Sequence, residues 1–433
     1  MHLRALRKTL AADLRAGTER GRMMRSAGVT AGLKLGATLL AFGASLIYAR
    51  ALEPHGYGLY AYVIAWTALL TIPAGLGFST YLIREGSKAP ASLRWLRRWA
   101  DKRVLLSGIA AGILLACAWF VPQAADARWL FIIAAPLPLL NNLSAVRRAL
   151  LQARGRVARA QWPLLILGPA LMLIALAILW VWRGRLYPIE LVAAMTGAAI
   201  VPILVNHWQL HRSTRASGSQ ALEGARVRAA LPFMWLGMLY LVNNRADLIL
   251  LGTLRGAHDA GIYAVASRAA ELVTFFLVAA NMVLAPRIAR LYHEGNLALL
   301  QRLLTAAVRR VFLFTLPIAL VFIVAAHPLL YYLYGPAYAQ GALALQILAG
   351  AQLLATSSGP RGVVLNMTGH EKLTAVGVTL SAALNIALNA ALIPLFGVQG
   401  SAMATGISIV AFSLLLWYWV RRRVGVNPSA LRW

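Results

Sequence analysis

The chain has 433 residues, of which 60% are apolar and only 13% are charged. Soluble domains carry about 25% charged residues, so this composition excludes an ordinary soluble globular protein. The formal net charge of +29 would indicate nucleic-acid binding in a soluble protein. Here most of the cations lie between apolar runs, where they set topology and face anionic lipid, and we expect no nucleic-acid partner. The single cysteine, Cys117, excludes an intrachain disulfide and a multi-cysteine metal site.

Residues 1–28 precede the first apolar run and are rich in arginine. No small-residue cleavage site follows a short apolar stretch, so the segment is not predicted to be a signal peptide. Its leucines recur at helical spacing, which is compatible with an amphipathic helix on the cytoplasmic membrane surface. A flexible basic tail fits the same residues.

Apolar runs long enough to span a bilayer then alternate with short connectors, which predicts an all-α, polytopic membrane protein. We expect about twelve spans, at 29–49, 58–82, 104–121, 129–147, 161–182, 187–210, 229–251, 261–284, 311–327, 339–364, 373–396 and 400–420.

Every second connector is loaded with Arg and Lys, and the connectors between them are nearly bare. The bare connectors hold only Arg50, Arg128, Arg183, Arg185 and Arg255. Because cytoplasmic loops carry the positive charge of membrane proteins, both termini are predicted to be cytoplasmic. The expected location is the inner, cytoplasmic membrane of a bacterium, with phospholipid as the surrounding partner.

The chain also repeats itself, because residues 55–84 align without gaps on residues 258–287. An even number of predicted spans separates the two copies, so they run in the same direction and imply two parallel six-helix lobes. The expected organisation is a basic segment 1–28, an N-terminal lobe 29–210, a connector 211–228, a C-terminal lobe 229–420 and a basic tail 421–433. The identical pairs are His55/His258, Gly58/Gly261, Tyr60/Tyr263, Ala61/Ala264, Leu69/Leu272, Thr71/Thr274 and Arg84/Arg287.

Motifs for chemistry on a substrate are missing from the sequence. It contains no phosphate-binding loop of an ATPase and no His-Glu-x-x-His zinc motif. The short outside connectors leave no room for the pocket of a glycan ligase or polymerase. We therefore predict a transporter rather than an enzyme, with no catalytic residue, no metal and no cofactor, driven by an ion gradient or the membrane potential.

Charged residues inside the spans are costly and normally face a polar interior, which makes them candidates for a site. Arg268 is the deepest cation, and Glu271 follows it at i+3, so a structural ion pair and a substrate contact are both compatible with the spacing. Lys34 fits either a cavity or snorkelling to the surface. Arg245 is placed nearer the outer end. Asp247 and Glu271 are the acids placed within spans and hence the candidate ion-coupling residues.

Three further residues complete the candidate substrate-binding set. Arg361 is predicted near the inner end of the tenth span, and Asn385 and Asn389 share one face of the eleventh. The two asparagines suit either substrate binding or interhelical hydrogen bonding. Cations outnumber acids in the interior, which favours an anionic head group such as phosphate or pyrophosphate over a cationic drug.

Several short motifs resemble one family in their order and spacing across nearly the whole chain. They are Tyr57-Gly-Leu-Tyr60 with Arg84-Glu85, Arg245-Ala-Asp-Leu-Ile-Leu-Leu-Gly252 with Gly261-Ile-Tyr263, Leu333-Tyr-Gly-Pro-Ala-Tyr338, and Ile393-Pro-Leu-Phe-Gly397-Val-Gln-Gly400-Ser-Ala402. The set resembles Wzx-type O-antigen flippases of the multidrug/oligosaccharidyl-lipid/polysaccharide exporter superfamily.

The resemblance implies a V-shaped bundle of two six-helix lobes that moves an undecaprenyl-pyrophosphate-linked oligosaccharide from the inner to the outer leaflet. The lipid-linked oligosaccharide would be used for lipopolysaccharide O-antigen or other surface polysaccharide, with a polymerase or ligase as possible partners. The related lipid II flippases typically have two more spans than the twelve found here. A drug or cation antiporter of the same fold remains the main alternative, and a membrane enzyme of glycan assembly is a third hypothesis.

Overall fold

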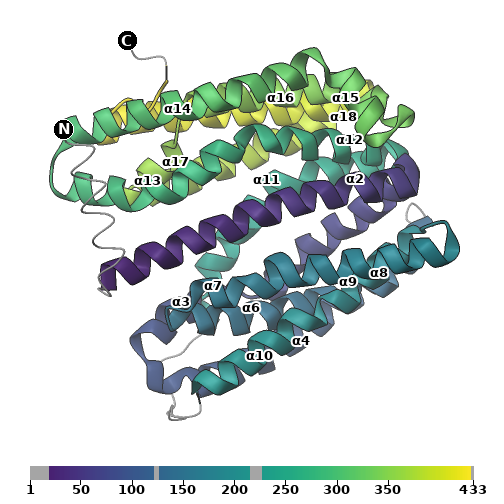
Figure 1. Ribbon diagram of the computed structural model, residues 1–433, viewed down its shortest axis with the longest axis horizontal. Helices are drawn as coiled ribbons and strands as arrows, with labels where there is room; N and C mark the ends of the chain where they lie inside the picture. The colour runs from purple at the N-terminus through teal and green to yellow at the C-terminus, as the bar shows by residue number, and fades with distance from the viewer. Residues whose placement is uncertain (1–18, 121–125, 215–226, 431–433) are drawn as a thin grey trace.

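The computed structural model describes residues 19–120, 126–214 and 227–430, and every regular element within these ranges is helical. Residues 1–18 of the expected basic segment 1–28 and residues 215–226 of the expected connector 211–228 lie outside the described residues, whereas residues 19–28 belong to the first helix. Figure 1 shows two groups of helices, with the first half of the purple helix α2 between them. The all-α fold predicted from the sequence is confirmed.

The N-terminal lobe contains the spans up to residue 214. Its helices are α2 (Glu19–Ala74), α3 (Phe78–Lys88), η1 (Pro90–Ser92), α4 (Leu93–Ala116), η2 (Cys117–Phe120), α5 (Arg128–Ala134), α6 (Leu137–Ala153), α7 (Val157–Trp162), the π-helix η4 (Pro163–Leu167), α8 (Gly168–Arg183), α9 (Pro188–Ala198) and α10 (Ile200–Thr214).

The C-terminal lobe follows. Its helices are η5 (Val227–Ala229), α11 (Leu231–Arg255), α12 (Ala257–Ala270), η6 (Glu271–Thr274), α13 (Phe275–His293), α14 (Leu297–Val324), α15 (Ala326–Tyr334), η7 (Pro336–Gly341), α16 (Ala342–Ser357), α17 (Arg361–Met367), α18 (Glu371–Trp419) and the π-helix η8 (Val420–Val424).

Eight segments of the described chain are long and apolar enough to cross a membrane. Two of them, Gly28–Ala74 and Glu371–Val424, are bent at Glu53 and Gly397 and each provides two spans. The helices α4 and α11, which are of similar length but more polar, bring the number to the twelve expected. The protein is therefore a multi-pass membrane protein with two six-helix lobes.

Some predicted boundaries were wrong. The span expected at 311–327 belongs to a helix that begins at Leu297, where the Asn296 side chain caps the backbone N–H of Leu299 at 3.0 Å. Because the first half of this helix contains arginines, the sequence predicts a connector there. A helix can, however, extend beyond the bilayer. The span expected at 58–82 is interrupted at Leu76 and Gly77, which both have positive φ.

The two halves share an unusual backbone break immediately before their repeated segments. Glu53 has φ 57° and ψ 172°, and Gly256, which is the equivalent residue in the second half, has φ 91° and ψ 179°. Glycine adopts this conformation easily, whereas any other residue is strained by it. The repeat seen in the sequence is therefore a repeat of the backbone as well.

The two repeats cross where the lobes meet, with a glycine from each. A Cβ on Gly58 would overlap the carbonyl oxygen of Ala257, and a Cβ on Gly261 would overlap that of Pro54. Pro54 and Ala257 are themselves equivalent positions, so the contact is reciprocal. Because a side chain larger than hydrogen cannot be accommodated there, these two glycines permit the closest approach between α2 and α12.

The buried cores show how the lobes are joined. One core is shared by both lobes and includes Ala49 and Tyr57 of α2, Tyr263 of α12 and Tyr338 of η7, whose hydroxyl donates to the Ala49 carbonyl at 2.9 Å. This core lies at the predicted outer end. Nearer the predicted inner end, one core around Phe78 joins the N-terminal lobe to Ala230 at the start of α11, and a second core around Ile288 lies within the C-terminal lobe. The most extensive core shared by the lobes is therefore at the predicted outer end, where the V closes.

Candidate functional site

A cavity of about 700 Å³ lies between the lobes and is lined by both of them. Tyrosines form much of its wall, with Tyr48, Tyr57 and Tyr60 from α2 and Tyr240 from α11. Sequence reasoning missed these residues, although the short spacing of Tyr57 and Tyr60 was visible within the quoted motif. Tyrosine offers an apolar ring and a hydroxyl together, which suits a ligand with both sugar rings and polar substituents.

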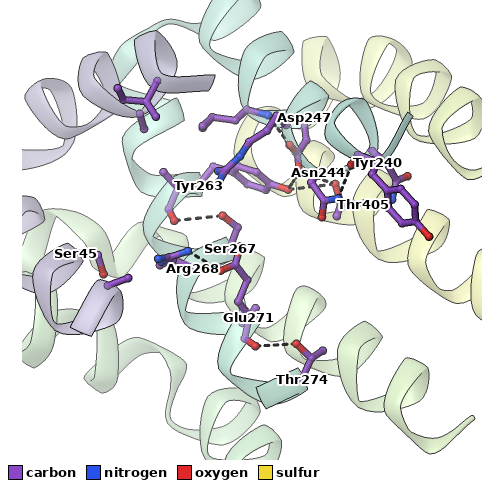
Figure 2. A pocket seen from close by; sticks show the side chains of 18 of the residues that line it. Ser45, Tyr240, Asn244, Asp247, Tyr263, Ser267, Arg268, Glu271, Thr274 and Thr405 are labelled. Carbon is purple, nitrogen blue, oxygen red and sulfur yellow. Dashed lines mark hydrogen bonds and ion pairs between the residues drawn. The ribbon is translucent and has the colours of Figure 1, made fainter. Parts of the chain in front are cut away.

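The charged residues of the cavity come from the C-terminal lobe, and they include most of the predicted set. Figure 2 shows Asp247 on α11 and Arg268 and Glu271 on the α12–η6 segment, with Ser45 of α2 on the opposite side. Arg245, Arg361 and Asn385 line the same cavity. The residues brought together are thus Arg245, Asp247, Arg268, Glu271, Arg361 and Asn385.

Arg268 and Glu271 form the ion pair that their i+3 spacing indicated. The Arg268 Nη1 donates to Glu271 Oε2 at 2.8 Å, and the side chains are 32% and 54% exposed. One guanidinium edge is used by this pair, and a guanidinium has five donors. Arg268 can therefore be paired and still present donors to an anion in the cavity.

Arg245 is a second cation of the cavity wall. Within the described residues, its guanidinium has neither a hydrogen bond nor an ion pair. Arg245, Arg268 and Tyr60 all line this cavity. Two guanidinium groups around a tyrosine-lined space form a suitable site for a phosphate or pyrophosphate.

Asp247 is buried and held by hydroxyl groups. Its Oδ2 accepts a hydrogen bond from the Tyr263 hydroxyl at 2.5 Å and one from Thr405 Oγ1 at 3.2 Å, while Oδ1 accepts from the Leu248 backbone N–H. Only 6% of the residue is exposed. An ionisable residue buried inside a membrane span is costly, and such residues commonly mark ion pathways or sites.

The two asparagines belong to the same polar network. Asn385 Nδ2 donates to Thr405 Oγ1 at 3.2 Å, and Asn389 Nδ2 donates to the Asn385 carbonyl at 2.8 Å. Ser401 Oγ in turn donates to Asn389 Oδ1 at 2.9 Å. Asn389 is fully buried behind Asn385. The contacts correspond to interhelical hydrogen bonding, and Asn385 is the one asparagine of the pair that reaches the cavity wall.

Both Nη atoms of Arg361 donate hydrogen bonds within the protein. Its Nη1 bonds the Ala355 and Gly359 carbonyls and Ser358 Oγ, and its Nη2 bonds Ser413 Oγ. The residue is 9% exposed. It therefore ties α16, α17 and α18 together, and only part of its side chain borders the cavity.

Lys34 and its neighbours lie apart from this wall. Lys34 is exposed on the inner half of α2 and does not line the cavity. The glycines expected to form a packing ridge beside it, Gly28, Gly32 and Gly36, have nothing within 4 Å of a Cβ built on them. The ridge is therefore unpacked here, because the first half of α2 stands away from other helices at the predicted inner end.

Two protein families match parts of this sequence. The polysaccharide biosynthesis protein family matches residues 23–292. That range is more than half of the chain. The chain belongs to the polysaccharide biosynthesis protein family. The MatE family also matches, over residues 232–391, which is the region that carries most of the cavity charges.

Solved structures of related transporters share the fold of this family member. An inward-facing multidrug resistance MATE transporter of the MOP superfamily superposes with a TM-score of 0.74 at 15% identity, covering 91% of this chain and 98% of the other. The inward closed conformation of the lipid II flippase MurJ gives 0.68 at 16% identity, covering 90% and 86%. At these identities the likeness shows that the chain has the fold of these transporters.

A curated relative is an uncharacterized membrane protein of Methanocaldococcus jannaschii, 26% identical over 180 residues. The match covers 39% of this chain and 35% of that protein. The chain thus matches about a third of the length of this relative.

Proposed function

We propose that this transporter flips an undecaprenyl-pyrophosphate-linked oligosaccharide from the cytoplasmic to the outer leaflet of the bacterial inner membrane by alternating access. The product would supply O-antigen or other surface polysaccharide, and both termini would lie in the cytoplasm. The observation that carries the proposal is the pair of cavity arginines, Arg245 and Arg268, in a protein of the polysaccharide biosynthesis family. A pyrophosphate is the part of such a substrate that these guanidinium groups recognise.

The state of the acids supports an anionic substrate over a cationic drug. Glu271 is neutralised by Arg268, and Asp247 is buried and bonded to hydroxyl groups. Arg245 keeps a positive charge on the cavity wall without a described partner. A drug antiporter needs a carboxylate that is free to pair with its cation, so we retain it as the second candidate on the strength of the MatE match alone.

The cavity is large enough for only one part of the proposed substrate. A volume of about 700 Å³ accommodates a pyrophosphate and a few sugar rings but not a long polyprenyl chain. The chain would stay among the lipid tails, where its burial is favourable, while the head group crosses.

Asp247 is the favoured residue for energy coupling. It is buried on α11 and bonds to α12 and α18 at once, so protonation or cation binding there would change contacts between three helices. Glu271 remains the second candidate, although its ion pair with Arg268 gives it a structural role as well. An ion gradient or the membrane potential would supply the energy.

Variants of Arg268 test the proposal in proteoliposomes with undecaprenyl-pyrophosphate-linked sugars. Arg268→Ala should abolish most flipping, and Arg268→Lys should recover little of it, because one ammonium cannot reproduce paired guanidinium donors. Arg302→Ala, on the exposed face of α14, is the matched control and should flip normally.

The double variant Arg268→Ala with Glu271→Ala separates the two roles of the arginine. If Arg268 only neutralises Glu271, flipping returns in the double variant at normal protein levels, and the substrate contact is disproved. In cells, loss of the gene should abolish surface polysaccharide. Unchanged polysaccharide with raised drug sensitivity would favour the antiporter, and glycosyl transfer by the pure protein would favour an enzyme.

A further inference from the structure

A group of basic and aromatic residues lies at the predicted inner end of the N-terminal lobe, apart from the cavity. It is formed by α4 and α10, on the side of this lobe that faces away from the C-terminal lobe (Figure 1). We call it the α4–α10 cluster, and it consists of Arg97, His207, Trp208, His211 and Arg212. None of these residues lines the cavity. A ligand of this cluster would therefore differ from a substrate held between the lobes.

Arg97 is half-buried, and within the described chain its positive charge pairs with no carboxylate. Asp101, one turn further along α4, is already occupied by Arg147, whose two Nη atoms donate to its two carboxylate oxygens at 2.8 and 3.3 Å. The partner of Arg97 is instead His207, with 3.4 Å between Nη1 and Nδ1. A guanidinium has donors only, so Nδ1 is the acceptor and the imidazole in this contact is neutral. The histidine therefore orients the arginine without neutralising it.

His211 and Arg212 add further basic groups, one turn along α10 from His207 and Trp208, and all four side chains are exposed. The Arg212 guanidinium lies over the Trp208 ring, with Cζ 3.9 Å from the ring centroid. This contact engages the face of the guanidinium and leaves the N–H donors at its edge. In the parts of the chain that the structure describes, Arg212 forms no ion pair with a carboxylate either. Positive charge that is gathered in this way without acids of its own is stabilised by an anion.

The position of the cluster along the membrane normal identifies the kind of anion. Trp208 is 54% exposed near the predicted inner end of α10, and exposed indole rings favour the head-group region of a bilayer. The basic residues around it therefore lie at the level of the lipid phosphates of the cytoplasmic leaflet, where anionic lipids attract Arg and Lys. A guanidinium binds two phosphate oxygens at once through parallel N–H donors.

We infer that the α4–α10 cluster is a binding site for the head group of an anionic phospholipid of the cytoplasmic leaflet. Arg97, oriented by His207, and Arg212, held over Trp208, supply the donors to its phosphate. A lipid-linked substrate also carries phosphate, but its head group would have to reach Arg268 in the cavity, which the cluster does not line. The cluster therefore fits a lipid that stays in the bilayer, and the inference is independent of what the protein transports.

Titration of the purified full chain in detergent with phosphatidylglycerol, followed by native mass spectrometry, tests this site. Zwitterionic phosphatidylcholine is the comparison lipid. Arg97→Gln with Arg212→Gln should weaken the tightest phosphatidylglycerol site about ten-fold or more, because two phosphate contacts are lost, and should leave phosphatidylcholine binding unchanged. The matched control, Arg302→Gln with Arg310→Gln, removes the same charge from the exposed face of α14. It should bind both lipids as the unchanged protein does.

Equal weakening in the two double variants would indicate a general effect of charge and would overturn the site, as would no weakening in either. Arg97→Lys keeps the charge and serves where the double variant does not insert. It should still lose affinity for phosphatidylglycerol, because one ammonium cannot donate to His207 and also hold two phosphate oxygens, and unchanged binding would overturn the site. Undecaprenyl pyrophosphate is the third probe. If the cluster variants lose this lipid and retain phosphatidylglycerol, the cluster belongs to substrate entry and the phospholipid site is disproved.

Discussion

The two repeated segments of this chain have the same backbone and different chemistry. Tyr60 and Tyr263 are equivalent residues, yet the Tyr263 hydroxyl donates to Asp247 at 2.5 Å, while the Tyr60 hydroxyl has only a 3.8 Å contact with the sulfur of Met195. The break at Glu53 repeats at Gly256. The architecture has thus been retained in both halves, whereas the polar partners of equivalent side chains have not.

The cavity charges follow the same division. At the positions equivalent to Arg245, Asp247, Arg268 and Glu271, the N-terminal half has Phe42, Ala44, Ala65 and Ala68. A symmetric bundle therefore encloses an asymmetric cavity, with charges on one wall and small or aromatic residues on the other. Such asymmetry suits a substrate whose two ends differ in chemistry, and it separates residues that close the bundle from residues that recognise the substrate.

The largest effect on flipping is expected at the glycine crossing, where the two halves make the same contact. Gly58→Ala and Gly261→Ala each place a methyl group on a backbone carbonyl of the other half. Overpacking of this kind costs about 1–3 kcal/mol or more, and 3 kcal/mol reduces the closed population roughly a hundred-fold. Flipping in proteoliposomes should fall accordingly, to a similar extent for both variants.

Cross-linking reports on the closed outer end in the same variants. With Cys117 replaced by Ser, cysteines at Arg50 and Tyr332, whose side chain and carbonyl are in contact, should be joined by a short bifunctional thiol reagent in the otherwise unchanged protein and poorly in either glycine variant. Gly43→Ala on α2 is the control, because nothing lies within 4 Å of a Cβ there. Normal cross-linking in both glycine variants would refute the proposed role of the crossing.

A smaller effect should separate the two equivalent tyrosines. Tyr263→Phe removes a hydrogen bond to a buried carboxylate, and such bonds contribute about 1.5–3 kcal/mol. Tyr60→Phe removes only a weak contact with sulfur. We expect Tyr263→Phe to lower thermal stability and the ion dependence of flipping, and Tyr60→Phe to leave both nearly unchanged. Equal effects of the two substitutions would mean that the hydrogen bond to Asp247 does not make Tyr263 more important than Tyr60.

The smallest effect concerns the strained residue of the first break. Glu53 is exposed and has a φ of 57° that its counterpart Gly256 adopts without strain. Glu53→Gly should therefore raise the stability by about 1 kcal/mol, seen as a higher Tm in detergent, with flipping unchanged. The reverse substitution, Gly256→Ala, should lower Tm. A drop in Tm for Glu53→Gly would show that the carboxylate has a role that its contacts do not reveal.

Much of the fold could be predicted because a bilayer imposes length and polarity on each span. The gap expected between 396 and 400 contains the bend at Gly397, and the repeat offset is confirmed by the breaks at Glu53 and Gly256. Polarity could not locate the start of α14, because Arg302 and Arg309 lie on a helix that extends beyond the apolar region. Helix ends outside a bilayer depend on caps such as Asn296, which hydropathy does not detect.

The candidate site was predictable only in part. Charges within spans pointed to Arg245, Asp247, Arg268 and Glu271, because ionisable side chains in a membrane require a polar environment. The contact of Asp247 with Thr405, 158 residues away, depends on tertiary packing that no local pattern encodes. The same limitation applies to Arg361. The sequence does not distinguish an arginine that bonds to the surrounding chain from one that is free.

The reciprocal glycine crossing has a consequence for the origin of the chain. A contact in which Gly58 meets Ala257 and Gly261 meets the equivalent Pro54 has the form of an isologous interface, in which one surface patch pairs with its own copy. A single six-helix half assembling with a second copy would make this contact twice with one glycine. Fusion of two such copies would remove the need for identical partners, and each wall of the cavity could then acquire charges independently while the crossing stayed common to both.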